Sequence, residues 1–335
     1  MAAIEVRNLH KRYGRHVAVE DVSFCVEEGE IFGIIGPNGA GKTTTVESVA
    51  GLRRPDSGSV SVLGLDPVTE RAEVRERLGV QLQESRLPDA ITVAEALELY
   101  GSFYRKPADQ GELMELLGLG EKRKTRYKAL SGGQKQRLSI ALALVGGPKV
   151  AILDELTTGL DPQARRDTWS LVERVRERGV TVLLVTHFMD EAERLSDRIA
   201  VIDKGRVVAV DTPAGLIAQS SAVQQVRFRV SRPLDRGVLT ALPEVTEVEV
   251  SEGRWVVTGR GQLLSGVAGA LARAEVVAED LRVDQRTLDD AFVAFTGHVS
   301  ESSESPGSPE SPESPESSEP LDSPESSARS ERRAG

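Results

Sequence analysis

Short apolar runs alternate with longer helical patterns over the first 220 residues. Three of these runs, Ile31–Ile35, Val150–Leu153 and Val180–Val185, indicate buried strands. Because these runs are apolar at consecutive positions, they are typical of strands that are covered on both faces. Strands of this kind separated by helices predict an α/β domain with a mostly parallel sheet over residues 1–220. Two more strands that flank residues 203–206 predict a hairpin that closes the domain.

The pattern changes between residues 221 and 298. Apolar residues at 226–230, 248–250 and 255–257 indicate strands, and residues 263–272 have the pattern of a helix. We therefore predict that this segment forms a small C-terminal α+β domain.

The chain ends in a predicted helix followed by a charged tail. The helix is expected from Thr287 to Phe295, because Thr287 is a favourable N-cap and Gly297 a favourable end. Residues 299–335 are mostly Ser, Pro and Glu, a composition that predicts a disordered tail. From residue 300 onwards nine Asp or Glu stand against three Arg, so this tail carries −6 of the chain's net −10.

Composition and charge exclude several classes of protein. The chain has 335 residues, 39% hydrophobic and 28% charged, which is enough for two domains. No run reaches the roughly 18 to 20 consecutive apolar residues of a membrane span, and no secretory signal is evident. The single cysteine, Cys25, excludes an internal disulfide and a zinc site of several thiolates. We expect a cytoplasmic protein, and the acidic charge predicts no nucleic-acid partner.

A glycine-rich loop follows the first predicted buried strand. Its sequence fits Gly-x4-Gly-Lys-[Ser/Thr], the pattern of a phosphate-binding loop, whose backbone N–H groups and helix N-terminus bind phosphates. Lys42 is expected to neutralise the β- and γ-phosphates, and Thr43 to bind Mg²⁺. An ordinary glycine turn before a helix is the alternative. The predicted loop comprises Gly36, Pro37, Asn38, Gly39, Ala40, Gly41, Lys42, Thr43 and Thr44.

Two carboxylates and a histidine follow the other two predicted buried strands. Asp154 and Glu155 end the second run, and His187 follows the third. Acidic residues in this position are usually structural, but beside a phosphate loop Asp154 can be an Mg²⁺ partner and Glu155 can polarise the attacking water. His187 is expected at the same sheet edge, where it can orient Glu155 or reach the γ-phosphate.

The segment Leu130-Ser131-Gly132-Gly133-Gln134-Lys135-Gln136-Arg137 gives the sequence a family resemblance. Together with the phosphate loop, it resembles the signature of the ATP-binding subunits of ABC (ATP-binding cassette) transporters, over residues 1–218. The resemblance implies a P-loop NTPase core with a helical subdomain at about residues 84–145. It also implies that Ser131, Gly132, Gly133 and Gln134 cap the γ-phosphate held by the opposite protomer of a dimer.

The same resemblance assigns further residues and marks one departure. Tyr13 matches the aromatic residue that stacks on adenine, and Gln83 the glutamine that contacts Mg²⁺ or the attacking water. Asp161 matches a loop that crosses between protomers, and His187 matches the switch histidine. The family usually has proline directly after the catalytic glutamate, whereas this chain has Leu156. Proline restricts the backbone, so its absence puts the rigidity of the following loop in doubt.

The C-terminal segment from Asp280 to Gly297 resembles the end of stand-alone ATPases of the daunorubicin-resistance type. We therefore expect an ATPase subunit of an exporter of drugs, antibiotics or similar hydrophobic compounds. It would bind ATP and Mg²⁺, dimerise on ATP, and power separate membrane-spanning subunits from the inner face of the cell membrane. The alternative, a soluble ABC-type ATPase acting on DNA, needs a coiled coil or zinc insertion. The 85 residues between Thr44 and Leu130 carry neither pattern.

Overall fold

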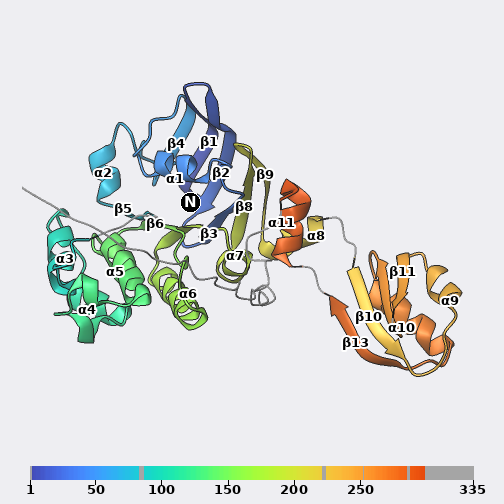
Figure 1. The fold of residues 1–335 in the computed structure, drawn as a ribbon. Coiled ribbons are helices and arrows are strands. Elements are labelled where there is room, and N and C mark those ends of the chain that lie inside the picture. Colours follow the sequence, from blue (N-terminus) through green and yellow to red (C-terminus); the bar gives the residue numbers. More distant parts are fainter. Residues whose placement is uncertain (1, 83–86, 221–223, 252, 285–286, 299–335) are drawn as a thin grey trace, which may run out of the picture. The chain divides into compact units, whose positions relative to one another are not determined.

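The computed structural model describes residues 2–82, 87–220, 224–251, 253–284 and 287–298 (Figure 1). The larger of its two sheets has nine strands in the order β4-β1-β2-β9-β8-β3-β7-β6-β5. These strands are β1 Ala2–Tyr13, β2 His16–Glu27, β3 Ile31–Ile35, β4 Ser57–Val62, β5 Leu78–Gln81, β6 Val150–Asp154, β7 Thr181–Val185, β8 Arg198–Asp203 and β9 Arg206–Asp211. The pairs β5–β6, β6–β7, β7–β3 and β3–β8 are parallel.

Helices of this part of the chain lie between the strands. They are α1 Lys42–Val49, α2 Arg71–Arg75, α3 Val93–Gly101, α4 Gln110–Leu116, α5 Gly132–Leu144, α6 Pro162–Glu177, α7 Met189–Leu195 and α8 Pro213–Gln219, with short 3₁₀ turns at Gly120–Lys122 and Tyr127–Ala129. Helices α3, α4 and α5 contribute to one core cluster and lie in the range where the helical subdomain is predicted. None of the helices in the described residues is long and apolar enough to cross a membrane.

The central strands are buried on both faces, as their continuous apolar sequences predict. In β6, Ala151 and Leu153 join a core cluster with α3, α4, α5 and α6, whereas Val150 and Ile152 join a second cluster with α1, β1, β2 and β4. The side chains of a strand point alternately to opposite faces, so two apolar layers require an apolar residue at every position. The predicted strands and closing hairpin are confirmed as β3, β6, β7 and β8–β9, within an α/β fold.

Three strands at one end of the larger sheet were not predicted. Strand β1 pairs antiparallel with β2 on one side and with β4 on the other. The pairing of β1 with β2 shifts register several times between Ala2 and Arg12, so the buried side chains do not alternate regularly along the sequence. An irregular strand of this kind leaves no clear period of two for sequence analysis to detect.

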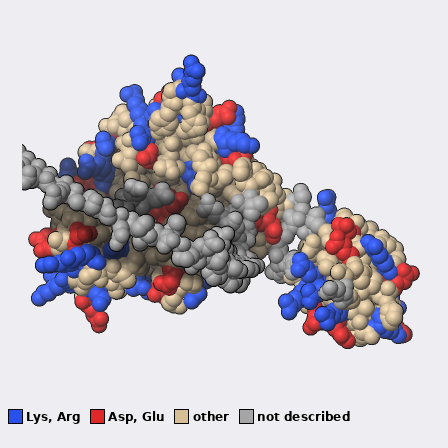
Figure 2. Space-filling model, viewed as in Figure 1, with Lys and Arg blue, Asp and Glu red and all other residues tan. Residues whose placement is uncertain are grey.

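A second sheet lies in the C-terminal part, with strand order β11-β12-β10-β13. It consists of β10 Gln224–Val230, β11 Val245–Ser251, β12 Arg254–Gly259 and β13 Ala278–Asp284, with α9 Arg236–Thr240 and α10 Leu263–Arg273. Its core contains Phe228 and Trp255, whose rings stack with centroids 6.3 Å apart, and Val267 and Leu271 of α10. On the face of the molecule in Figure 2, charged side chains of both signs are interspersed over both sheets.

The last helix, α11 Leu288–Thr296, packs on the nine-stranded part and not on the small sheet. Leu288 and Phe292 belong to a buried cluster with Met189 of α7 and Leu216 of α8. Its predicted ends are confirmed, because the Thr287 side chain caps the helix in a capping box and Gly297 follows in the left-handed region. The domain boundary at residue 221 stays a prediction.

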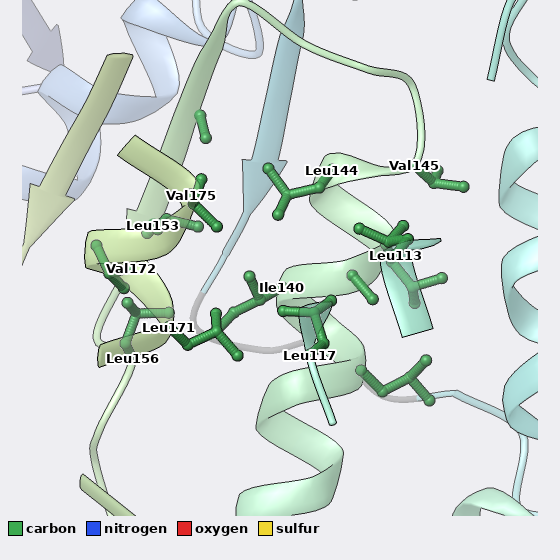
Figure 3. Packing of buried hydrophobic residues seen from close by; sticks show 14 of the residues in the cluster. Leu113, Leu117, Ile140, Leu144, Val145, Leu153, Leu156, Leu171, Val172 and Val175 are labelled. Carbon is green, nitrogen blue, oxygen red and sulfur yellow. The ribbon is translucent and has the colours of Figure 1, made fainter. Parts of the chain in front are cut away.

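Leu156, the residue in place of the usual proline, is completely buried. It belongs to the cluster below the central strands, where Figure 3 shows it beside Leu171 and Val172 of α6. The following residue, Thr157, is also completely buried, and its carbonyl oxygen accepts a hydrogen bond of 3.1 Å from Leu160 N. Burial of two consecutive side chains therefore anchors this loop where proline would restrict its backbone.

We expect Leu156→Ala to lower the free energy of unfolding by about 2–5 kcal/mol, because it leaves a cavity in a closely packed cluster. Leu99→Ala is the matched control, since Leu99 is 48% exposed on α3 and its truncation should change stability by less than about 1 kcal/mol. Denaturant unfolding of both variants measures the difference. Equal losses in the two would show that Leu156 does not anchor the loop.

Candidate functional site

The glycine-rich loop lies between β3 and α1, where the sequence predicted it. Gly41 is the N-cap of α1 and has a φ of 101°, in the left-handed region that favours glycine. A Cβ at Gly41 would also collide with the carbonyl oxygen of Ala18. Both constraints require glycine at this position, directly before the N-terminus of α1, where backbone N–H groups can bind an anion.

Lys42 stabilises the phosphate loop through hydrogen bonds from its side chain to carbonyl oxygens of the loop itself. Its side chain is buried, and Nζ donates hydrogen bonds to the carbonyl oxygens of Gly36 at 2.7 Å and Pro37 at 3.0 Å. An ammonium group has three donors and interacts strongly with phosphate oxygens. The same group can therefore fix the shape of the loop and contribute positive charge to a bound phosphate.

The turn of the β8–β9 hairpin supports the loop from outside. Gly205 N donates a hydrogen bond of 2.9 Å to the carbonyl oxygen of Ala40, and Gly205 O accepts bonds from Glu20 N and Asp21 N of β2. Lys204 and Gly205 both have positive φ, 48° and 75°, as expected for a two-residue hairpin turn. Sequence analysis predicted this hairpin but not its contact with the phosphate loop.

Asp154 lies at the end of β6 and is almost completely buried. The pKa of its carboxyl group is raised to about 6, mainly because the group is buried; the nearby charge of Glu155 contributes to the rise, and Lys42 opposes it. The backbone N–H of Asp154 donates to Gln81 Oε1 at 3.1 Å. Because burial disfavours the lone negative charge, a cation beside Asp154 would be strongly favoured.

Glu155 and His187 form a pair at the same edge of the sheet. His187 Nδ1 lies 3.4 Å from Glu155 Oε1, and both side chains are mostly buried, 17% and 14% exposed. Glu155 has a φ of 50°, which is unusual for a residue with a side chain. Its backbone N–H donates to the carbonyl oxygen of Val185 at 2.9 Å, so β7 helps to hold the Glu155 backbone in this conformation.

A pocket of about 340 Å³ joins nine of the predicted residues, from the phosphate loop, the acidic pair and Tyr13. Tyr13 forms part of its wall with its ring 41% exposed, and the cationic groups of Lys11 and Arg53 lie 5.6 and 5.9 Å from the ring centroid. His16 and Ala18 also line the pocket, although the sequence gave no signal for them. The predicted residues that line it are Tyr13, Asn38, Gly39, Gly41, Lys42, Thr43, Thr44, Asp154 and Glu155.

The signature segment is not part of the lining of this pocket. Ser131 is the exposed N-cap of α5 and forms a capping box with Gln134. Asp161 caps α6 by accepting bonds from Gln163 N and Ala164 N. Gly133 lies close to Ala164, so the starts of α5 and α6 are neighbours. Gln83, predicted to contact Mg²⁺ or the attacking water, lies outside the described residues.

A strand, a phosphate-binding loop and an acidic pair at one sheet edge define a P-loop nucleotide hydrolase. A family model described as ABC transporter matches residues 19–158. The chain is 39% identical over 305 residues to daunorubicin resistance ATP-binding protein DrrA3 of Streptomyces coeruleorubidus, covering 88% of this chain and 96% of that protein. It therefore belongs to the ATP-binding, ATP-hydrolysing subunits of ABC transporters.

One further relative and two solved structures agree with this assignment. Nod factor export ATP-binding protein I of Burkholderia lata is 42% identical over 255 residues, 74% of this chain and 84% of that protein. A solved ATP-binding subunit of an ABC transporter is 29% identical, with a TM-score of 0.59, over 65% of this chain and 92% of that one. A dimeric ATP-binding cassette bound to ADP and Pi is 28% identical, with a TM-score of 0.56, over 62% and 98%.

Lys42→Ala and Glu155→Gln should affect ATP hydrolysis in different ways. Lys42→Ala removes a charge that acts on both bound ATP and the transition state, so both affinity and turnover should fall. Glu155→Gln keeps the shape of the side chain but removes the carboxylate that accepts a proton. ATP should therefore still bind while kcat falls by about 10²–10⁴. Steady-state hydrolysis and equilibrium ATP binding measure both effects. Near-normal turnover of Glu155→Gln would remove this residue from the catalytic role.

Proposed function

We propose that the chain is the ATP-hydrolysing subunit of an exporter of drugs, antibiotics or similar hydrophobic compounds. The observation that carries the proposal is the similarity to DrrA3, which covers 88% of this chain and so extends beyond the nucleotide-binding part. The likeness to a Nod factor export protein also favours export. Separate membrane-spanning subunits would contact the cargo, and this chain would lie on the inner face of the cell membrane.

ATP would bind in the pocket beside the phosphate loop. Backbone N–H groups of the phosphate loop and of the N-terminus of α1 would contact its phosphates, and Lys42 would add positive charge. Tyr13 offers its exposed ring for stacking on the adenine. The residue proposed to stack on the adenine and the residues proposed to bind the phosphates thus line one pocket.

Thr43 and Asp154 are the residues that would hold Mg²⁺, since both line the pocket and both offer oxygen. Two protein oxygens suit this ion, which keeps several waters and binds substrate phosphates directly. The unfavourable burial of a lone charge at Asp154 also fits a neighbouring cation. Bound Mg²⁺ would neutralise charge on the β- and γ-phosphates. Gln83 is proposed as a further contact of the ion.

Hydrolysis would depend on Glu155 and His187. We assign Glu155 as the group that polarises the attacking water and accepts its proton. His187 is close enough to orient the Glu155 carboxylate, with 3.4 Å between Nδ1 and Oε1. In this assignment, the loops after β6 and β7 must hold a fixed relative position for the water to be aligned.

A second protomer would complete the site. Ser131, Gly132, Gly133 and Gln134 stand outside the pocket of their own chain, at an exposed helix N-terminus suited to a phosphate. We propose that they bind the γ-phosphate held by the opposite protomer, with Asp161 crossing between the two. The dimeric state of a solved relative supports the formation of a dimer.

Glu155→Gln should form an ATP-dependent dimer, because ATP that is not hydrolysed would keep the two protomers together. Size-exclusion chromatography with ATP, with ADP and without nucleotide measures the association. Adding Ser131→Arg to Glu155→Gln should abolish the shift, since it places a bulky side chain at the exposed α5 N-cap where the γ-phosphate would lie. A shift that persists in the double variant, or no shift in Glu155→Gln, would contradict the signature contact.

Cells that carry Glu155→Gln in place of the native chain should accumulate more of the exported compound. Daunorubicin, together with a panel of other hydrophobic antibiotics, is the probe, and intracellular drug is measured after loading. Leu99→Ala, a change on the exposed face of α3, should accumulate no more than the native strain. Equal accumulation of every compound in the native, Glu155→Gln and deletion strains would contradict an export function for these compounds.

A further inference from the structure

A buried acid joins α6 to α7 behind the proposed catalytic pair. Glu191, in the first turn of α7, is 0% exposed, and its Oε1 accepts a hydrogen bond of 3.0 Å from Trp169 Nε1 of α6. Acidic side chains are rarely buried to this degree unless they are paired. No described Lys, Arg or His forms an ion pair with Glu191, so a role other than charge pairing is needed to explain it.

Glu191 also lies next to both proposed catalytic loops. Thr157 comes two residues after Glu155, and Thr186 comes directly before His187. Both threonines are completely buried, and their hydroxyl groups lie close enough to the Glu191 carboxyl to act on its pKa. One side chain therefore contacts the loop of the proposed base and the strand end of its proposed partner.

Two oxygen atoms of this cluster have no hydrogen-bond partner in the described part of the chain, and a protonated Glu191 carboxyl group would provide a donor for one of them. Among the described residues, Glu191 Oε2 and Thr157 Oγ1 are both buried and make no hydrogen bond. Burial raises the pKa of Glu191, and the charge of Asp190 adds to this, while the hydroxyls of Thr186 and Thr157 and the Trp169 indole oppose it. A neutral Glu191 has an O–H that could donate to Thr157 while Oε1 still accepts from Trp169.

A second set of contacts between α6 and α7 reaches His187 from the other direction. The Arg165 guanidinium lies 4.4 Å from the centroid of the Phe188 ring and pairs with Asp190 at 3.3 Å. The Phe188 ring in turn lies 4.1 Å from the His187 ring. The His187 loop is thus packed against α6 on one side and Glu191 on the other, which would keep its position coupled to that of α6.

We propose that Glu191 is a positioning residue for ATP hydrolysis, which holds the Glu155 loop through Thr157 and the His187 loop through Thr186, with Trp169 as its fixed support. The inference rests on the catalytic roles proposed above for Glu155 and His187. Glu191 contacts neither ATP nor water in this role. It sets the relative position of two side chains that must both be aligned with the γ-phosphate.

Three variants test the role. Glu191→Gln keeps the shape and both kinds of hydrogen bond of the neutral acid, so kcat should stay within about two-fold of wild type. Glu191→Leu keeps the volume without hydrogen bonds, and Trp169→Phe removes the Nε1 donor. In both, kcat should fall by about 10–100-fold with the KM for ATP unchanged, because misplacement of catalytic groups affects turnover more than binding. A merely structural role would lower Tm and leave kcat unchanged.

Trp255→Phe is the matched control for Trp169→Phe. Trp255 is the other tryptophan of the chain and is buried in the small sheet, so its variant should keep wild-type kcat. If Glu191→Leu or Trp169→Phe folds and its kcat stays within two-fold of wild type, the positioning role of Glu191 is overturned. The proposed function is not affected by that result. If Glu191→Leu does not fold, Trp169→Phe decides by the same criterion. A wild-type protein that does not hydrolyse ATP would overturn the proposed function together with this inference.

Discussion

The nucleotide site depends on the register in which β7 pairs with its two neighbours. Val185 is the register partner of Ile34 in β3 on one side and of Asp154 in β6 on the other. Because the strands are parallel, this one level of the sheet places the phosphate loop, the acidic pair and His187 at a common edge. A shift of one residue in either pairing would turn each buried side chain to the opposite face and separate the groups.

This arrangement places two carboxyl groups in the protein interior. Asp154 and Glu191 are both carboxyl groups within the protein interior, and burial raises the pKa of both. Their surroundings nevertheless differ. Asp154 faces a pocket with Lys42 nearby, where a ligand cation can compensate its charge. Glu191 is fully buried, and its burial favours the neutral acid, while the surrounding hydroxyl and indole groups oppose this rise in its pKa. A buried carboxyl group can therefore serve two different purposes in this protein.

Sequence analysis could predict the chemistry of the site because that chemistry lies in contiguous segments. The phosphate loop, the Asp154-Glu155 pair and His187 each follow an apolar strand, so order along the chain and strand polarity together place them at one edge. The contacts that support these segments come from distant residues and leave no local pattern. Gln81 meets the Asp154 backbone only because β5 pairs with β6, and Gly205 meets Ala40 only through the hairpin turn.

The fold shows the same division between local and distant information. Continuous apolar runs identified the parallel strands β3, β6 and β7 but not the short β5, whereas the irregular register of β1 and β2 concealed those antiparallel strands. The ends of α11 could be predicted from Thr287 and Gly297, since caps are local. Which core it joins depends on which apolar surface remains uncovered after α7 and α8 have packed, and no short segment carries that information. In the sequence, Leu156 shows only that the usual proline is absent. Its burial, which anchors the loop, is visible only in the structure.

The return of α11 makes the small sheet an insertion in the chain. The polypeptide leaves the nine-stranded part after α8 and comes back to it at Leu288, beside the helix that follows His187. Cutting the chain at residue 220 would therefore remove more than the small sheet, because the apolar side chains of Met189 and Leu216 would be exposed to water. Excision of residues 224–284 with a short linker would instead keep the hydrophobic cover on α7. Evolution could exchange the inserted small sheet while the nine-stranded part retained its complete core.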